Sequence, residues 1–236
     1  MIRRLAELWE GRAWTLPAST CLQLPGLPIE QVLAGLNSRR AHRLRTALRK
    51  LDALDISVVE VGADRVEQSV AELLRLHARQ WESRGINTQH TQPRFQDHLT
   101  RAARSLVVDG HAMLTEFRVQ GRLLACDFVV AGKDFVGGYL YGAHPDLRAE
   151  ADVLTMLLRH NLATTHRLGK PVLSLLRGAE PYKTKFGCEA AVNQRVMLGR
   201  GLRATAYAAT ASARAAGQEL LKRRCPRLVE RCGAWR

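Results

Sequence analysis

The chain has 236 residues, a formal net charge of +14, 46% hydrophobic residues and 25% charged residues. These proportions are ordinary for a soluble globular protein, so a wholly disordered, collagen-like or low-complexity chain is excluded. Five cysteines occur without a C-x-x-C pair or zinc-finger spacing, which indicates neither a disulfide framework nor a structural zinc site. No run approaches the roughly 18 apolar residues of a membrane span. We therefore expect a cytoplasmic protein without a metal.

The positive charge is concentrated in two segments. Residues 37–52 carry a net charge of +5 and residues 195–236 a net charge of +8, whereas residues 53–194 carry only +1. A protein that mainly binds nucleic acid usually spreads its basic groups over the functional face. We interpret the two basic segments as additions to a neutral central region, able to make weak contacts with a polyanion.

Hydrophobic periodicity and turn residues predict the order of the elements. In chain order we predict an extended or turning segment over residues 15–36 in which 28–36 could start a short helix, a helix over 37–51, a strand over 56–61, helices over 66–81 and about 93–104, strands over 112–119, 122–131 and 134–142, a helix over 152–168, a strand over 172–176, a short helix over 180–185, a strand over 191–198 and a basic helix over about 204–224. Short glycine-containing connections between the three central strands favour an antiparallel meander. This order predicts an α+β fold with a mixed, largely antiparallel central sheet flanked by helices, and it excludes a doubly wound sheet.

Two stretches resemble a known family. The run LLRGAEPYKTKFG, residues 175–187, is similar to the F-L-R-G-D-E-P-Y-K-x-x-W/F-G signature of the GNAT acyltransferase branch associated with cellulose biosynthesis, which is related to the FemAB peptidyltransferases. The run YGAHPDLRAEADVL, residues 141–154, is similar to the sequence that leads into the long helix of that branch.

The likeness spans roughly residues 16–200 and implies a GNAT fold. It also implies three parts of the chain. We expect an N-terminal segment with the basic helix over residues 1–52, a GNAT-like acyltransferase domain over 53–203, and a basic C-terminal helix and tail over 204–236.

The resemblance implies where the donor acetyl-CoA would bind. In the GNAT fold the pyrophosphate lies at the N-terminus of the long helix, where free backbone N–H groups favour an anion. Here this position holds Arg148, Glu150, Asp152 and Val153. The two carboxylates would repel a pyrophosphate and Arg148 would offset part of the repulsion, while Asp152 is explained equally well as the helix N-cap.

The donor's pantetheine arm is expected on the strand over residues 134–142. In this fold the strand backbone pairs with pantetheine, so the resemblance places Tyr139, Leu140 and Tyr141 beside the donor. The two tyrosines have an alternative interpretation as ordinary strand aromatics that pack against a helix.

Two carboxylates on neighbouring strands are candidates for the general base. Strand alternation puts Glu116 and Asp127 on definite faces of the meander, and Asp127 stands out in an otherwise apolar strand. A half-buried carboxylate has a raised pKa, which suits a general base. The alternative for Asp127 is an ion pair with a nearby arginine. His144 is a further candidate for base or substrate contact, since histidine titrates near neutrality.

The signature run supplies the remaining candidates. Arg177 and Lys183 would bind a carboxylate, phosphate or donor oxygen, and Glu180 and Tyr182 would orient or protonate the leaving thiolate. An ion pair between Arg177 and Glu180 at the end of a strand is the alternative.

The sequence thus predicts an N-acyltransferase that moves an acyl group, acetyl from acetyl-CoA in the first instance, to a primary amine of a small molecule, amino acid or sugar. The mechanism would be direct attack in a ternary complex. Two alternatives stay open: transfer from aminoacyl-tRNA, as in FemAB-like proteins, and a non-catalytic domain that binds an acidic partner.

Overall fold

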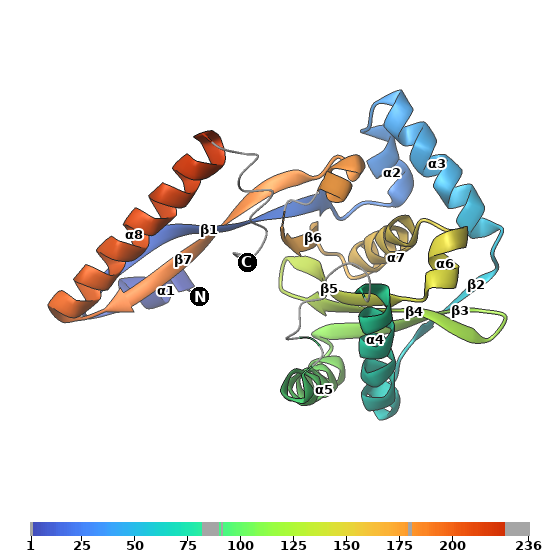
Figure 1. The fold of residues 1–236 in the computed structure, drawn as a ribbon, viewed down its shortest axis with the longest axis horizontal. Helices are drawn as coiled ribbons and strands as arrows, with labels where there is room; N and C mark the ends of the chain where they lie inside the picture. Colours follow the sequence, from blue (N-terminus) through green and yellow to red (C-terminus); the bar gives the residue numbers. More distant parts are fainter. Residues whose placement is uncertain (1, 82–89, 91, 179–180, 225–236) are drawn as a thin grey trace. The chain divides into compact units, whose positions relative to one another are not determined.

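The computed structural model describes residues 2–81, 90, 92–178 and 181–224 (Figure 1). The chain forms two compact units, one of residues 21–190 and one of residues 1–20 with 191–236. These units do not coincide with the three predicted segments, because two long strands, β1 and β7, each run from one unit into the other.

The elements follow the predicted order closely. They are α1 (Ile2–Glu7), β1 (Arg12–Pro25), α2 (Ile29–Ala34), α3 (Ser38–Asp52), β2 (Ile56–Glu60), the 3-10 helix η1 (Ala63–Arg65), α4 (Val66–Trp81), α5 (Pro93–Val108), β3 (Ala112–Val119), β4 (Arg122–Ala131), β5 (Phe135–Ala143), α6 (Pro145–Glu150), α7 (Val153–Arg167), β6 (Val172–Arg177), the 3-10 helix η3 (Pro181–Phe186), β7 (Glu189–Gly199) and α8 (Gly201–Arg224).

One sheet organises the chain, with the strand order β2-β3-β4-β5-β6-β1-β7. The pairs β2–β3, β3–β4, β4–β5 and β1–β6 are antiparallel, and β5–β6 is parallel. The predicted α+β class with a mixed, largely antiparallel sheet is therefore confirmed. The parallel pair is connected by α6 and α7, as a parallel crossover requires.

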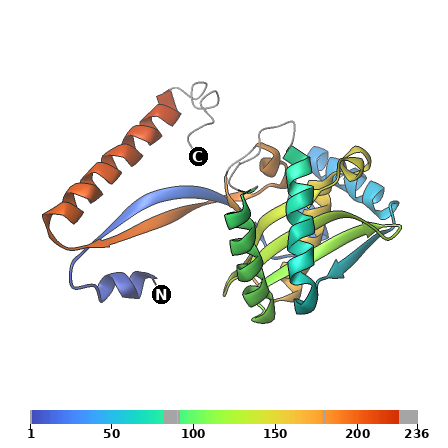
Figure 2. The same ribbon diagram turned by 60° about the horizontal axis from the view of Figure 1, so that its bottom comes forward.

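In the unit of residues 21–190, helices cover both faces of the sheet (Figure 2). The helices α4 and α5 bury an apolar stripe against one face of the sheet. Leu73 and Leu76 of α4 and Phe128 of β4 belong to the same core cluster there. The other face packs against α7, with α2 and α3 beside it, through Leu158, Leu162 and their neighbours. The helix α4 approaches β5 so closely that a Cβ at Gly142 would lie 2.5 Å from the backbone nitrogen of His77.

Local signals in the sequence explain several boundaries. The predicted cap of α3 is confirmed, since the Asn37 side chain accepts a hydrogen bond from the backbone N–H of Arg40 at 3.0 Å. The meander lies within one residue of its predicted limits. The short helix α6 was not predicted, and the segment predicted as extended or turning forms a 14-residue strand, β1, up to Pro25.

The unit of residues 1–20 and 191–236 has a small set of contacts of its own. The indole of Trp9 donates a hydrogen bond to the carbonyl of Gly199 at 3.4 Å, and Arg200 forms an ion pair with Glu10 at 2.9 Å. The helix α8 exposes large apolar side chains, with Leu202 at 89% exposure. Within the described ranges, no helix combines the length and the apolar character needed to cross a bilayer.

Candidate functional site

The strands β5 and β6 separate in the middle of the sheet. Their parallel pairing extends only as far as Gly137 and Ser174. A register shift against β4 leaves Tyr139 as an extra residue in β5, which is a β-bulge. Bulges bend a strand and interrupt its ladder, so residues 138–141 have no paired position on β6. A pocket of about 350 Å³ lies beside this stretch.

The pocket is lined from both faces of the sheet. Its lining consists of His77, His90, Asp127, residues 138–141, Leu154, Leu157, Leu158, Asn161, Leu173, residues 175–177, Lys183 and Phe186. The helix α7 supplies four of these residues and α4 supplies His77, which belongs to the opposite face. A Cβ at Gly138 would meet the side-chain nitrogen of Asn161 at 3.9 Å, so the glycine keeps this part of the pocket open.

Asp127 is the buried carboxylate of the pocket. It lies on β4 at 3% exposure, and its Oδ2 accepts a hydrogen bond from Nδ2 of Asn161 at 2.8 Å. Burial raises the pKa of Asp127 to about 7, while the hydrogen bonds from Asn161 and from the backbone N–H of Phe128 offset part of the rise. The group therefore changes its charge near neutral pH, as a general base for an amine requires. Among the described residues, Asp127 forms no ion pair with a neighbouring arginine, which was its alternative interpretation.

Two histidines to which the sequence analysis assigned no role, His77 and His90, also line the pocket. Nδ1 of His77 lies 2.8 Å from the carbonyl oxygen of Tyr141, and a carbonyl can only accept, so Nδ1 carries the proton. Nε2 of His77 lies 3.1 Å from Nδ1 of His90. Burial lowers the pKa of both rings, which keeps them neutral at pH 7. No pattern in the sequence predicts that His77 and His90 line the pocket.

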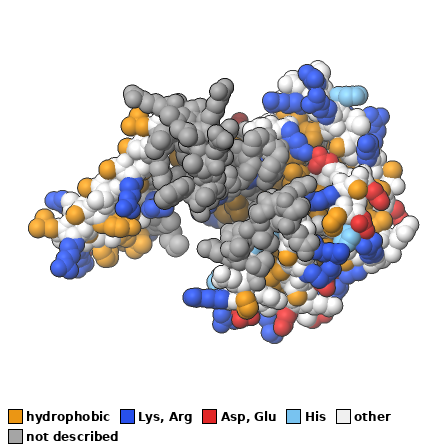
Figure 3. All heavy atoms as spheres, viewed as in Figure 1, with side chains coloured by type: hydrophobic (Ala, Val, Ile, Leu, Met, Phe, Trp, Pro, Cys, Tyr) orange, Lys and Arg blue, Asp and Glu red, His pale blue; other side chains and the backbone are white. Residues whose placement is uncertain are grey.

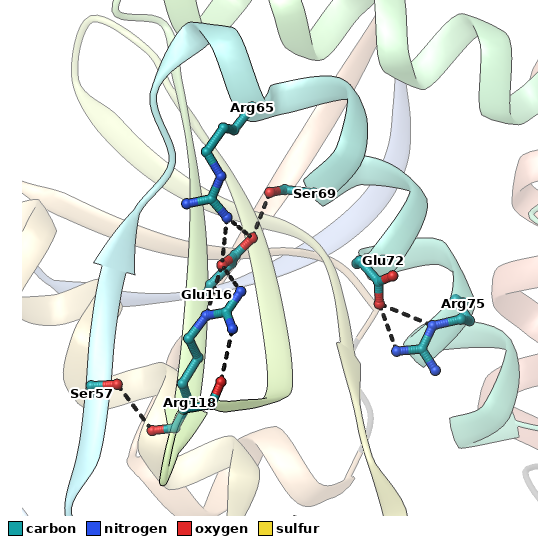
Figure 4. A network of polar contacts seen from close by, with 8 residues as sticks. Ser57, Arg65, Ser69, Glu72, Arg75, Glu116 and Arg118 are labelled. Carbon is teal, nitrogen blue, oxygen red and sulfur yellow. Dashed lines mark hydrogen bonds and ion pairs between the residues drawn. The ribbon is translucent and has the colours of Figure 1, made fainter.

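Glu116, the other candidate for the general base, is not among the residues that line the pocket. Its carboxylate accepts hydrogen bonds from Ser69 at 2.6 Å, Arg65 at 3.1 Å and Arg118 at 2.7 Å (Figure 4). Burial alone would raise its pKa, but these hydrogen bonds and the two positive charges outweigh it and hold the pKa of Glu116 below its usual value. A carboxylate with three donors is a poor proton acceptor, so its role is structural.

Asp152 is the N-cap of α7, the alternative that the sequence left open. Its Oδ1 accepts from the backbone N–H of Thr155 at 3.2 Å, and its Oδ2 pairs with Nζ of Lys185 at 2.6 Å. Burial would raise its pKa, but the contacts with Lys185 and Thr155 prevail and lower it. A carboxylate thus takes the place at the helix N-terminus that a pyrophosphate would need, and Val153 is buried behind it at 4% exposure. These residues do not fit a pyrophosphate.

Arg148 remains available for an anion. It lies on α6, its Nη2 donates to the hydroxyl of Tyr141 at 3.3 Å, and its Nε is buried without a hydrogen-bond partner in the described part of the chain. No ion pair of Arg148 occurs among those residues. Tyr139, the bulge residue, packs its ring edge-on against Phe128 and is 47% exposed.

The signature run ends β6 in a strained turn. Leu176 has a φ of +51°, which is unusual for a branched residue, and Gly178 has a φ of +105°. Lys183 holds this turn, since its buried ammonium group donates to the carbonyls of Leu175 at 3.0 Å, Arg177 at 3.2 Å and Gly178 at 3.4 Å. The expected substrate contact of Lys183 is therefore replaced by three backbone carbonyls. Arg177 is exposed and lines the pocket.

The other predicted residues lie elsewhere or outside the description. His144 caps α6 and lies 3.0 Å from Arg79 and 3.3 Å from Arg122, away from the pocket lining. Burial lowers its pKa, with the two arginines adding to the effect and Asp146 opposing it. Glu180 falls outside the described residues, as does the side chain of Tyr182. In the described ranges, no group of three or more His, Cys, Asp or Glu side chains could hold a metal ion.

A mixed sheet whose parallel strands diverge beside a pocket, with helices on both faces, defines the GNAT fold as the class of this protein. The family model described as "Acetyltransferase (GNAT) domain" matches residues 38–184. The chain belongs to that family.

Solved structures with the same fold are distant in sequence. A conserved protein of unknown function from Bacteroides thetaiotaomicron is 12% identical, with a TM-score of 0.56 over 83% of this chain and 65% of that one. FemX is 9% identical, with a TM-score of 0.58 over 78% and 62%. The C-terminal domain of a putative lysylphosphatidylglycerol synthetase from Agrobacterium fabrum is 12% identical, with a TM-score of 0.51 over 84% and 66%. The chain spans less than two thirds of the length of each. No curated protein matches it.

Proposed function

We propose that this GNAT-family chain is an N-acyltransferase that moves an acyl group, acetyl from acetyl-CoA in the first instance, to a primary amine of a small molecule. The observation that supports this most is the buried Asp127 in a pocket at the divergence of β5 and β6. An ammonium acceptor must lose a proton before it can attack, and a carboxylate with a pKa of about 7 can take that proton at neutral pH.

The proposed reaction needs no covalent enzyme intermediate. Asp127 removes a proton from the ammonium group, and the neutral amine nitrogen attacks the thioester carbonyl carbon. The carbon–sulfur bond then breaks and its electron pair leaves with the thiolate, while the nitrogen gives up its second proton and the thiolate takes one up, so that an amide and a free thiol form. Glu180 and Tyr182 stay predictions for that last step. Holding both reactants in one pocket supplies the proximity that the uncatalysed reaction lacks.

Backbone and arginine contacts would hold the donor. The stretch of β5 that does not pair with β6 lies beside the pocket and includes Leu140, and the edge that faces β6 offers N–H and C=O groups for the amides of a pantetheine arm. Arg148 would meet a donor phosphate, because the N-terminus of α7 does not. Arg177, at the pocket and exposed, would meet a carboxylate or donor oxygen.

A second candidate, transfer from aminoacyl-tRNA, is favoured by two observations. The N-terminus of α7 is capped by the Asp152 carboxylate and does not suit a pyrophosphate. An aminoacyl ester has no pyrophosphate, so this cap would not oppose its binding. Basic side chains also gather over α3 (Figure 3), where they are exposed and form no ion pair among the described residues: Arg39, Arg40, Arg43, Arg45 and Lys50. Such a surface suits RNA phosphates. Fold similarity to FemX is consistent with this candidate and decides nothing about the donor.

The two candidates differ in their donor, so one comparison tests both. The full chain is assayed with a mixture of primary amines and either acetyl-CoA or an aminoacyl-tRNA, with the Asp127→Asn variant as the control. Product formation from acetyl-CoA that the variant lowers at least a hundredfold supports the first proposal. Product from aminoacyl-tRNA alone, weakened steeply by salt, supports the second. Transfer from neither donor contradicts both.

A further inference from the structure

The pocket has an apolar wall, and this wall bears on the acceptor that the pocket can take. Four elements, β5, α7, β6 and η3, contribute it: Leu140, Leu154, Leu157, Leu158, Leu173, Leu175, Leu176 and Phe186. On the α7 side, Asp127 and Asn161 are the polar side chains among these leucines. Lys183 also lines the pocket, but its ammonium group donates to backbone carbonyls.

We propose that the acceptor is a small primary amine with an apolar body, that Asp127 binds its ammonium group, and that Asn161 is the positioning residue that holds the Asp127 carboxylate. This inference rests on the proposed function and names the substrate class of the same site. A volume of about 350 Å³ is near the lower end for ligand pockets, so the body is small. Leucine walls offer no partners to the hydroxyls of a sugar, and an unpaired polar group is costly to bury.

The position of Asn161 supports its role. It lies on α7 one turn beyond Leu157 and Leu158, at 6% exposure, where another leucine would suit the surroundings. Its Nδ2 donates to the Asp127 carboxylate at 2.8 Å, which fixes the direction of that carboxylate. Its Oδ1 is buried and has no hydrogen-bond partner among the residues that the structure describes. Burying the Oδ1 atom of Asn161 without a partner costs free energy, and the hydrogen bond from its Nδ2 to the Asp127 carboxylate explains why an amide is present here.

Several ionisable groups surround this pair and would contribute to any pH dependence. Tyr141 of β5 pairs across from Asp127, and His160 of α7 is bonded to Thr115 on β3 at 3.2 Å. The groups that line the same pocket are His77 of α4, His90, Arg177 and Lys183. Burial lowers the pKa values of His77, His90 and His160 from the ordinary value of a histidine.

The substrate class is tested by binding without a donor, so that its failure is distinct from failure of the proposed function. Isothermal titration of the full chain compares hexylamine, glucosamine and lysine. We expect hexylamine to bind at least tenfold more tightly than the other two, and Leu158→Asn to reduce that preference. Equal or tighter binding of glucosamine overturns the proposal. So does a rate that follows the length of the donor's acyl chain and ignores the amine, because the pocket would then hold the acyl group.

The positioning role is tested by the pH profile of kcat/KM with the best amine. The hydrogen bond from Asn161 favours the ionised carboxylate, so Asn161→Leu should move the limb of Asp127 upward by at least one pH unit. Asn161→Ser, which keeps a donor, should move it less. Gln68→Leu, on the exposed side of α4, is the control and should leave the profile unchanged. If Asn161→Leu folds and lowers kcat without moving the limb, or if the serine variant moves it as far, the positioning role is refuted.

Discussion

Replacing Asp127 by asparagine should make the protein more stable at neutral and alkaline pH while it abolishes base catalysis. Asparagine has nearly the same shape and can still accept from Nδ2 of Asn161, so the packing is preserved. The charge is what changes. At 3% exposure, an ionised carboxylate with two hydrogen-bond donors is a costly group, and the asparagine amide does not have that cost.

The sign and size follow from the shift in pKa. The folded-state pKa of Asp127 is about 7 against an ordinary value of 3.8. Below the lower value the Asp127 carboxyl is protonated in both the folded and the unfolded state, so it does not lower the free energy of unfolding. Between the two values the folded state holds a proton that the unfolded state has released, so stability falls as pH rises. Three pH units correspond to about 4 kcal/mol, which we regard as an upper limit.

Urea unfolding of both proteins at pH 4.5, 5.5, 6.5, 7.5 and 8.5 measures this effect. The free energy of unfolding of Asp127→Asn, relative to the parent, should grow from about 1 kcal/mol at the lowest pH to roughly 2–4 kcal/mol at the highest. The same variant should lose at least a hundredfold in acyl transfer. Parallel stability curves across this range would refute the argument, because Asp127 would then ionise as freely in the folded protein as in the unfolded chain.

Three further substitutions test neighbouring parts of the site. Glu116→Gln should cost roughly 1–3 kcal/mol at pH 7, because the donors on Ser69, Arg65 and Arg118 lose their charged acceptor, and the cost should shrink as the pH falls through the range where Glu116 protonates; denaturant curves at two pH values check it. Lys183→Met should lower stability by roughly 2–4 kcal/mol in the same assay, because three backbone carbonyls lose a charged donor, and activity lost at unchanged stability would restore its substrate role. Asp152→Gly should tighten acetyl-CoA binding in isothermal titration, since it removes a like charge and exposes the end of α7; equal or weaker binding would exclude that end as a donor site.

The fold could be predicted because its signals are local. Glycine turns define the meander, and Asn37 followed by a leucine stripe defines α3. The strand β1 was harder, since it pairs with β6, more than 140 positions later in the chain, and its prolines favour turns. The division into two units depends on such distant pairing, and the change in charge near residue 195 marks only its second boundary, not the one at residue 20.

The site was predictable in residue types more than in contacts. The apolar strand around Asp127 indicated a buried carboxylate, and the signature run led to the turn at residues 175–178. What Lys183 binds could not be read from the motif, because its partners are carbonyls, which every residue has. Asn161 and His90 carry no sequence signal, since their roles arise from the residues that folding places beside them.

The comparison of Asp127 with Glu116 shows why position in a strand does not assign a base. Both are buried carboxylates on adjacent strands, but Glu116 pairs with Cys126 and Asp127 pairs with Thr115, so their side chains lie on opposite faces of the sheet. Glu116 faces Arg65, Arg118 and a hydroxyl, which stabilise its charge, whereas Asp127 has an amide and a backbone N–H among leucines, which do not compensate for burial. Their pKa values therefore move in opposite directions. Adding a positive charge to the pocket beside Asp127 should lower the pKa of Asp127 and make it a poorer base. The apolar wall that we propose to select the amine would therefore also keep the Asp127 carboxylate able to deprotonate that amine.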